Sequence, residues 1–335
     1  MHVEDETLIN VDTERQEIIK RVRRFGGSAS DAVLDPGCSI FTLPNIDGMI
    51  AYRYAHSCAV VYGDPLCAKE DLEQLVCAFH QVCDEKGLNV VYVTSTEHFS
   101  RWALKRICKA MIEFGEELHL DPNNNPKDQT GVKGSLVRRK VRHALKDGCI
   151  VNEYIPSDLK LEEAIEKVGI SWLQARQGPQ IHTSNIHLFE NRSGKRWFYV
   201  SHQGSVVGVI VLNQLQACNG WLVNHLMYSP EAPNGTPELL LTHALEVVAK
   251  EDCHYVTFGS VPSASLGEIK GLNPFARFMA RAFFWIAHKI FHLGGKLTFW
   301  GKFHPRSKPS YLVFSSSSIG CKELRALMAA LNVSF

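Results

Sequence analysis

The sequence lacks the patterns that assign a chain early to several large classes of protein. Its 36 basic and 35 acidic side chains leave a formal net charge of +1, which gives no overall attraction to nucleic acid. No uncharged stretch is long enough to span a bilayer, and the polar N-terminus has no apolar signal-peptide core. Walker, GxSxG and HExxH motifs do not occur. We therefore expect neither an integral membrane protein nor an enzyme of those three motif classes.

Paired cysteines are also absent, although the chain has 10 cysteines. They are scattered, and no two of them stand in a CxxC spacing. The spacing therefore predicts no zinc or other metal site and no redox centre. It favours a reducing cytosol in which the thiols act as small core residues. No cofactor is expected from any motif.

What the sequence has is an alternation of helical and extended patterns over 335 residues with 45% hydrophobic content. This predicts an α/β (α+β) fold with mixed sheets. Length favours two domains, and the break at Pro156 and Ser157 places them at 1–155 and 156–335. The clearest predicted strands are 58–62, 89–93, 112–120, 196–202, 205–212, 220–228 and 255–259. The clearest predicted helices are 68–86, 135–147, 161–174, 239–250, 275–293 and 322–331.

One predicted helix is basic throughout. Between Lys133 and Lys146 there is no acidic residue. Arg138, Arg142 and Lys146 share one face because they are four residues apart, and Arg139 lies beside them. A solvated helix commonly mixes both signs of charge, so this pattern favours a polyanion such as tRNA as a partner. The residues predicted to bind it are Lys133, Arg138, Arg139, Arg142 and Lys146.

The segment Ser229–Glu238 links a predicted strand to a predicted helix. Asn234-Gly235 favours a turn with positive φ, Thr236 suits an N-cap, and Pro237 suits the first helical position. Backbone amides at a helix N-terminus can hold an anion. Capping alone also accounts for the segment.

The predicted helix 275–293 is amphipathic. Its apolar residues form one stripe, which Phe284 and Trp285 widen, and Arg277 and Arg281 lie on the other side. A basic and aromatic helix is suited to the interface of an anionic membrane, and it is also compatible with ordinary packing on a sheet. The residues predicted to face lipid are Phe278, Arg281, Phe284 and Trp285.

Taken in order, several segments resemble the phosphatidylglycerol lysyltransferase C-terminal-domain family, the cytosolic part of the multiple peptide resistance factors, with fungal relatives that aminoacylate ergosterol. The Tyr228–Thr236 segment resembles the family's "dpdAPNG" loop and is the most specific. The other segments that carry the likeness are Gly63-Asp64-Pro65, Phe114–Asp121, Lys133–Arg142, Ser171–Gln180 and Phe299–Pro305 with Tyr311-Leu312.

The resemblance implies two tandem GNAT-like domains that use aminoacyl-tRNA as co-substrate and esterify a lipid hydroxyl, in a cytoplasmic protein held peripherally at the inner membrane face. Carried onto this chain, it implies catalytic roles for Lys302, Asn234, Gly235 and Thr236. The substrate-binding residues that it implies are Glu117, Arg176, Asn224, His225, Glu238 and Tyr311.

This chain departs from the family pattern at Asn224, where many lipid-acting members have an acid. Two alternatives therefore stay open beside lipid aminoacylation. One is aminoacyl transfer to a peptide or protein acceptor. The other is a non-catalytic module of the same fold that binds lipid or tRNA.

Overall fold

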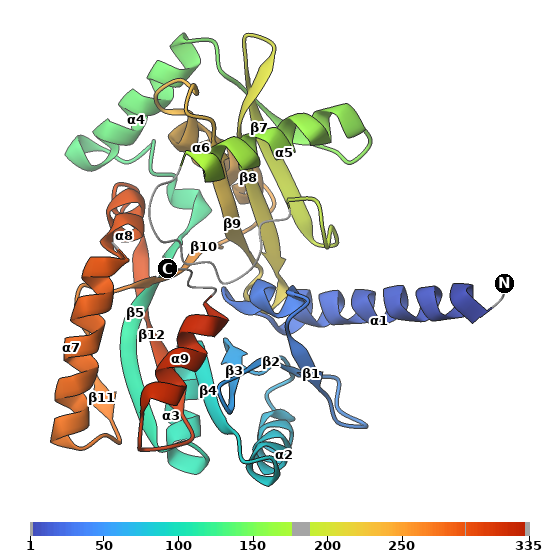
Figure 1. Cartoon of the computed structure of the whole chain (residues 1–335). Coiled ribbons are helices and arrows are strands. Elements are labelled where there is room, and N and C mark those ends of the chain that lie inside the picture. Colours follow the sequence, from blue (N-terminus) through green and yellow to red (C-terminus); the bar gives the residue numbers. More distant parts are fainter. Residues whose placement is uncertain (1–2, 176–187, 292, 332–335) are drawn as a thin grey trace.

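The computed structural model describes residues 3–175, 188–291 and 293–331, and its strands form one mixed sheet (Figure 1). The strands are β1 (Ser39–Phe41), β2 (Ile50–Ala55), β3 (Cys58–Tyr62), β4 (Asn89–Thr96), β5 (Ala110–Leu120), β6 (Ile150–Tyr154), β7 (Lys195–His202), β8 (Ser205–Leu215), β9 (Gly220–Tyr228), β10 (Tyr255–Pro262), β11 (Ile269–Lys270) and β12 (Arg306–Phe314). Their order is β1-β2-β3-β4-β12-β5-β10-β9-β8-β7-β6, and β11 pairs with β5.

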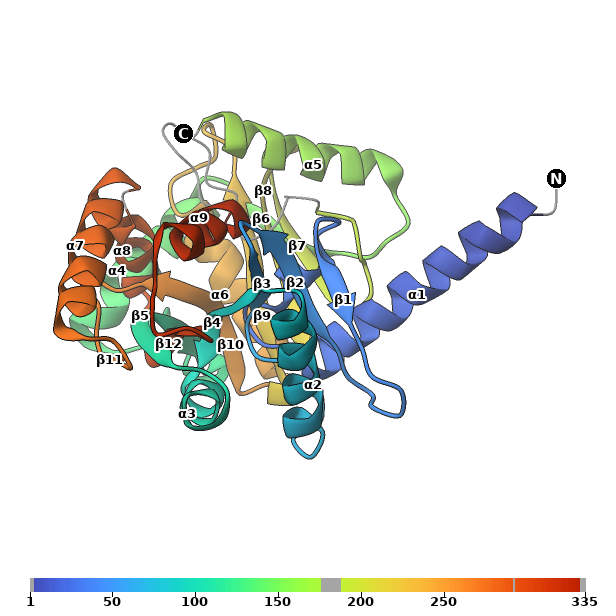
Figure 2. The ribbon, with the colours of Figure 1, turned by 60° about the horizontal axis from the view of Figure 1, so that its bottom comes forward.

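Helices lie on both faces of this sheet (Figures 1 and 2). The α-helices are α1 (Val3–Phe25), α2 (Leu72–Glu85), α3 (Glu97–Arg106), α4 (Gly131–Lys146), α5 (Leu159–Gln174), α6 (Thr236–Ala249), α7 (Pro274–Ile290), α8 (Gly294–Gly301) and α9 (Cys321–Ala330). Short 3-10 turns are η1 (Ser30–Leu34), η2 (Pro122–Asn124) and η3 (Gln216–Cys218). The predicted α/β class with mixed sheets is confirmed.

The two halves of the sheet repeat one arrangement. In the first half, β1, β2 and β3 are antiparallel, and β3 then pairs in parallel with β4 after the crossover through α2. In the second half, β6 to β9 are antiparallel, and β9 pairs in parallel with β10 after α6. β5 and β10 join the halves as antiparallel neighbours.

Two strands cross the division predicted at residue 155. β6 precedes this residue in the chain and yet pairs with β7 in the second half. β12 comes late in the chain and yet lies between β4 and β5 in the first half, where α9 also contacts β2 and β3. Each half is therefore completed by a segment from the other side of the predicted boundary.

Local chemistry sets the start of the amphipathic helix. The Asn273 side chain accepts a hydrogen bond from the backbone N–H of Ala276 at 2.8 Å, and Pro274 occupies the first helical position. The helix predicted at 275–293 is therefore α7 at Pro274–Ile290. A further helix that the sequence did not predict, α8, follows directly and leads to Lys302.

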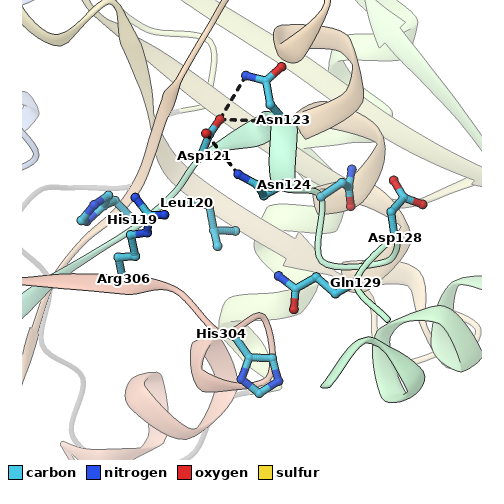
Figure 3. Close-up of a pocket in the computed structure, with 10 residues that line it drawn as sticks. His119, Leu120, Asp121, Asn123, Asn124, Asp128, Gln129, His304 and Arg306 are labelled. Atoms are coloured by element: carbon cyan, nitrogen blue, oxygen red, sulfur yellow. Dashed lines mark hydrogen bonds between the residues drawn. The ribbon is translucent and has the colours of Figure 1, made fainter. Parts of the chain in front are cut away.

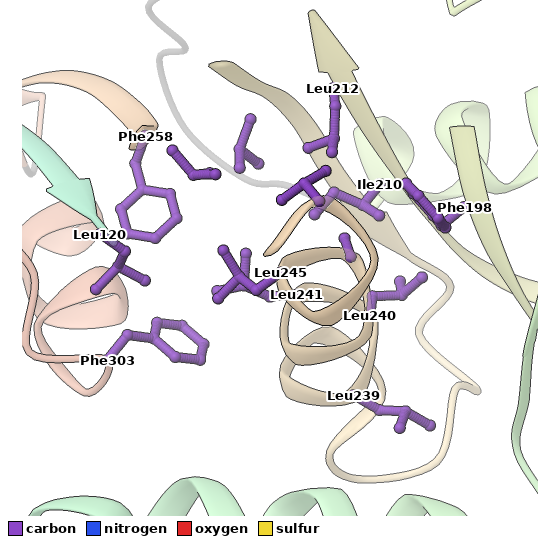
Figure 4. Packing of buried hydrophobic residues seen from close by; sticks show 14 of the residues in the cluster. Leu120, Phe198, Ile210, Leu212, Leu239, Leu240, Leu241, Leu245, Phe258 and Phe303 are labelled. Carbon is purple, nitrogen blue, oxygen red and sulfur yellow. The ribbon is translucent and has the colours of Figure 1, made fainter. Parts of the chain in front are cut away.

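The largest core cluster surrounds α6 (Figure 4). Leu239, Leu240, Leu241 and Leu245 are buried around the whole helix, because α6 packs on the sheet and also against α4. Phe258 and Phe303 reach the same cluster from β10 and from the turn after α8. Burial on all sides fixes the position of the N-terminal turn of α6.

The parallel strands β9 and β10 separate soon after they meet. They pair only over Gly220–Leu222 and Tyr255–Thr257. Directly beyond this point Asn224 is the extra residue of a bulge, since Val223 pairs with Leu212 and His225 pairs with Val211. The sheet therefore opens where β9 carries a polar side chain.

Candidate active site

The loop before α6 packs tightly against the basic helix α4. Gly235 has a φ of 102°, and a Cβ at this residue would lie 2.0 Å from the Lys140 carbonyl oxygen. Both the left-handed backbone and the close approach therefore require glycine. Asn234 and Gly235 form the predicted positive-φ turn. Thr236 was predicted as an N-cap, but its buried hydroxyl instead donates to the Pro233 carbonyl at 2.7 Å, so it closes the loop rather than capping the helix.

Replacing Gly235 with alanine should therefore destabilise the fold by roughly 3 kcal/mol, the sum of backbone strain and steric overlap. Gly204→Ala is the matched control, because Gly204 also has positive φ (80°) but has open space around its Cβ position. We expect the control to cost about 1 kcal/mol. Urea unfolding of both variants measures the difference, and equal losses would contradict the tight packing of the loop on α4.

Two lysines converge on this loop and on the first turn of α6. Lys140 Nζ donates to Asn234 Oδ1 at 2.5 Å, and Lys302 Nζ lies 2.6 Å from Glu238 Oε1. The side chains of Lys302 and Glu238 are only 16% and 6% exposed. The Lys302 ammonium also lies 3.7 Å from the centre of the Phe299 ring. Lys302, Asn234 and Glu238 were all predicted as site residues, and the structure brings them together. Lys140, which was not predicted, lies with them.

The electrostatics of this group favour an anion at the start of α6. Burial lowers the pKa of the Lys302 ammonium, the Glu238 carboxylate opposes this effect, and the nearby charge of Lys140 lowers the pKa further. The N-terminal end of α6 adds its own partial positive charge. A developing oxyanion or a phosphate placed here would meet two ammonium groups, of which that of Lys302 is already paired with the Glu238 carboxylate.

Glu117 on β5 lies in a second polar group, together with Tyr255 of β10 and Lys308 of β12. Its carboxylate accepts hydrogen bonds from the Ser28 hydroxyl at 3.0 Å and from the Tyr255 hydroxyl at 2.5 Å. Lys308 Nζ lies 4.6 Å from the centre of the Tyr255 ring. Burial raises the pKa of Tyr255, and the Glu117 charge adds to this effect. Tyr255 is therefore a hydrogen-bond donor to Glu117.

A polar pocket of about 490 Å³ lies beside the N-terminus of α4 (Figure 3). Asp121 organises one wall by accepting hydrogen bonds from Asn123 and Asn124. The opposite wall is the loop that precedes α4. Arg138 holds this loop by donating to the carbonyls of Gln129 and Gly131, the latter at 3.2 Å. These backbone contacts fix the position of its guanidinium, and its role in binding tRNA stays a prediction.

The other predicted basic residues of α4 are placed differently. Arg139, Arg142 and Lys146 are exposed. The side chain of Lys133 lies outside the part of the chain that the structure describes. The surface offered by α4 is therefore made by its outer positions, while Lys140 points to the α6 loop.

The amphipathic helix α7 exposes its apolar face. Figures 1 and 2 show α7 at the outer edge of the molecule, away from α1 and α5. The exposed large apolar side chains are Phe275, Phe278, Met279, Phe283, Trp285, Ile286 and Ile290. Arg281 is exposed as well. Phe284 differs from the prediction, because with Ala276 and Ala280 it forms the narrow stripe that packs against the first-half core.

The remaining predicted residues are dispersed. Asn224 donates to Asp31 Oδ2 at 3.3 Å, and His225 lies next to it on β9. Tyr311 is buried in the core of the first half, among residues that include Tyr92 and Phe99. Arg176 lies outside the described residues. Sequence reasoning did not single out Lys140 or Asp31, and the only signal was the place of Lys140 on the acid-free helix.

Two solved structures share this fold. The L-PGS structure from Bacillus licheniformis aligns with a TM-score of 0.77 at 15% identity and covers 95% of each chain. A C-terminal domain described as that of a lysylphosphatidylglycerol synthetase from Agrobacterium fabrum aligns with a TM-score of 0.76 at 15% identity, over 96% of this chain and 98% of that one. Together with the repeated half-sheet, these likenesses confirm the predicted mixed α/β fold, in the arrangement of two like halves that the resemblance implies.

The chain belongs to the phosphatidylglycerol lysyltransferase, C-terminal, family, whose model matches residues 21–314. A phosphatidylglycerol lysyltransferase of Staphylococcus epidermidis is 21% identical over 301 residues, which cover 88% of this chain. The match spans 35% of that relative's length, about a third of the longer protein.

Proposed function

We propose that this protein transfers an aminoacyl group from a charged tRNA to a hydroxyl group of a membrane lipid. The observation that carries the proposal is the convergence of Lys140 on the loop before α6 and of Lys302 on the first turn of α6, directly beside the basic helix α4. Membership of the phosphatidylglycerol lysyltransferase family supports the lipid acceptor. A polyanionic donor fits a helix with exposed cations and no acid.

In the proposed reaction, the acceptor oxygen attacks the carbonyl carbon of the aminoacyl ester. The bond from that carbon to the ribose oxygen then breaks, and the ribose oxygen takes up the proton that the acceptor loses. The neighbouring ribose hydroxyl can relay this proton within a closed site. Lys302 donates a hydrogen bond to the oxyanion that forms between these steps. Lys140 and the amides of Asn234 and Gly235 hold the phosphate and ester of the tRNA 3′ end, while Thr236 closes the loop.

The exposed cations of α4 are proposed to hold tRNA phosphates. Replacing Arg139, Arg142 and Lys146 with glutamine should weaken tRNA binding and flatten its salt dependence, by roughly 0.7–0.9 in log–log slope per lost phosphate contact. A matched control replaces three exposed lysines elsewhere, Lys86, Lys105 and Lys160. Filter binding at several salt concentrations measures both. Equal effects of the two triple variants would attribute the loss to net charge and not to α4.

The apolar face of α7 is proposed to lie in the membrane interface. Exposed aromatic and aliphatic side chains cover this face, and Lys289 Nζ lies 3.8 Å from the centre of the Trp285 ring. Such a combination fits the boundary between acyl chains and anionic headgroups. Across residues 3–175, 188–291 and 293–331, no helix has the length and apolarity needed to cross a bilayer. Peripheral contact through α7, at the cytoplasmic membrane face, is the route to lipid that we propose.

A transfer assay tests this function against its two alternatives. The protein is mixed with tRNA charged with one radiolabelled amino acid at a time, and with liposomes made of lipid from the organism that produces the protein. We expect label in the lipid extract, and we expect this label to be absent when the donor tRNA is first treated with RNase. Label only in protein or peptide would support the other acceptor class. With every amino acid tried and tRNA binding intact, no transfer at all would indicate a binding module.

A further inference from the structure

The polar pocket at the N-terminus of α4 lies next to the proposed reaction site (Figure 3). One wall is joined to α6, because Asn125 Nδ2 donates to the Thr242 carbonyl at 2.8 Å. Thr242 follows Glu238 on α6 by about one helical turn, roughly 6 Å along the helix axis. Another wall is the turn after α8, where His304 follows shortly after Lys302. The pocket is therefore adjacent to the ion pair of Lys302 and Glu238.

The loop that precedes α4 holds the backbone of Gln129 in a fixed position at the pocket wall. The Gln129 carbonyl accepts a hydrogen bond from Arg138, and a Cβ at Gly134 would lie 2.1 Å from the same oxygen. Only glycine allows α4 to approach the loop so closely. In the part of the chain that the structure describes, the Gln129 side chain makes no hydrogen bond. From a fixed backbone, this amide therefore offers both a donor and an acceptor to the pocket.

His304 occupies a backbone position that glycine fills in most proteins. It follows the end of α8 with a φ of 53°, and its backbone N–H donates to the Gly301 carbonyl at 3.0 Å. A left-handed residue just after a helix is usually glycine, because a Cβ is unfavourable in this conformation. The preceding residue, Phe303, is fully buried in the α6 core and fixes the turn. The exposed imidazole lines the pocket and offers a flat surface on which a planar group can stack.

The charges around the pocket disfavour a phosphate group as its ligand. Burial by itself would raise the pKa of Asp121, but hydrogen bonds from Asn123 outweigh this effect, and the pKa is lowered. Asp121 is therefore ionised, and Asp128 adds a second carboxylate. Among the lining residues that the structure describes, Arg306 is the single permanent cation. The balance favours an uncharged group that carries several hydrogen-bond donors and acceptors.

We propose that this pocket binds the terminal base of the donor tRNA, the adenine whose ribose carries the aminoacyl ester. Every tRNA ends in adenosine, so the base next to the reacting ester is an adenine in each donor. Adenine is planar and uncharged, and its amino group lies beside a ring nitrogen that accepts. Gln129 Oε1 accepts a hydrogen bond from this amino group, while Gln129 Nε2 donates to the ring nitrogen. The His304 ring stacks on the face of the base.

This placement agrees with the roles proposed for the neighbouring lysines. The base lies in the pocket, the ester carbonyl meets Lys302, and the phosphate meets Lys140 on α4. Gln129 and His304 are then substrate-binding residues, and Arg138 is a positioning residue that holds the Gln129 carbonyl. The inference rests on the proposed transfer from aminoacyl-tRNA and adds a recognition site for the end of that donor.

The first test measures recognition of the adenine amino group. Two tRNAs that carry the same aminoacyl ester are compared as donors, one ending in adenosine and the other in purine riboside, which lacks the amino group. We expect kcat/KM to favour adenosine by about 30-fold in wild type and by about threefold or less in Gln129→Leu, since the pairing amide is lost. Gln216→Leu is the control, because Gln216 is exposed in η3, which contacts α1 and β9. It should keep the preference of wild type.

The second test uses His304→Gly, which separates stability from binding. Glycine suits the left-handed backbone, so thermal stability should equal or exceed that of wild type. The stacking surface is lost, so kcat/KM should fall about tenfold for both donors alike. Gln203→Gly is the control, because Gln203 is also exposed with a positive φ, 50°, and lies in the turn between β7 and β8. It should keep the kcat/KM of wild type.

The outcomes separate the two proposals. An unchanged preference for adenosine in Gln129→Leu, an equal loss in Gln216→Leu, or an unchanged kcat/KM in His304→Gly overturns the binding of the base in this pocket while the transfer activity stands. A raised KM for lipid in Gln129→Leu, with the preference for adenosine intact, overturns it as well and assigns the pocket to the acceptor. A wild-type protein that transfers nothing from any aminoacyl-tRNA overturns the proposed function, and this inference with it.

Discussion

Replacing Lys302 with methionine is expected to lower the turnover of aminoacyl transfer about 100- to 1,000-fold, the usual cost of removing one donor to an oxyanion. Affinity for tRNA should change far less, because the exposed cations of α4 are untouched. Single-turnover transfer measures the first quantity and filter binding measures the second. Equal losses in both would refute the catalytic role of Lys302.

Stability must be separated from chemistry in this variant. Removing Lys302 leaves the Glu238 carboxylate, 6% exposed, without its ion-pair partner, which typically costs about 3–5 kcal/mol. The double variant Lys302→Met/Glu238→Gln removes the unpaired charge and should recover most of that loss. It should nevertheless stay inactive. Recovery of both stability and turnover would show that Lys302 serves only the fold.

The second large effect concerns the membrane. The double variant Phe278→Asp/Trp285→Asp should bind anionic vesicles roughly 100-fold more weakly, since each aromatic side chain contributes about 1–2 kcal/mol when it enters the interface. Its fold should be unaffected, because these side chains are 68% and 58% exposed. Vesicle sedimentation measures binding, and circular dichroism measures folding.

The chain offers a matched control for this variant. Leu159 and Ile155 are each 76% exposed and lie at and just before the start of α5, on a different side of the molecule. Ile155→Asp/Leu159→Asp should bind vesicles as wild type does. If the control loses as much affinity as the α7 variant, or if neither loses any, α7 is not the membrane contact.

Sequence alone was sufficient where the determinants are local. The strands at Cys58–Tyr62 and Gly220–Tyr228 have the predicted bounds, because the first is an unbroken apolar run, the second is largely apolar, and each ends at turn residues. The turn at Asn234-Gly235 followed from its residue types. Its close contact with Lys140, which lies 94 residues earlier, did not.

Long-range pairing explains what the sequence could not supply. The five residues of β6 have no strong strand pattern of their own, and they form an edge strand because β7 pairs with them. The place of β12 between β4 and β5 depends on strands some 200 residues away. The same holds for the hydrogen bond between Asn224 and Asp31, which stand 193 residues apart in the chain.

Side-chain direction was the other source of error. The apolar stripe of α7 is wide enough for several rotations of the helix, and packing on the body selects the one that turns Phe284 inward. Arg138 belongs to a face of basic residues by its spacing, and the carbonyls of the preceding loop nevertheless take its guanidinium. A pattern predicts that a face exists, and tertiary contacts decide which residues are on it.

The proposed transfer to lipid is tested most directly by the mass of the lipid product. Wild-type protein and the Lys302→Met/Glu238→Gln variant are incubated with charged tRNA and liposomes, and the extracted lipids are analysed by mass spectrometry. We expect a lipid heavier by one aminoacyl group in the wild-type sample only, and mild alkali should release this group from the lipid, as expected for an ester. Unmodified lipid in both samples, with the aminoacyl group recovered on tRNA or on a peptide, would contradict it.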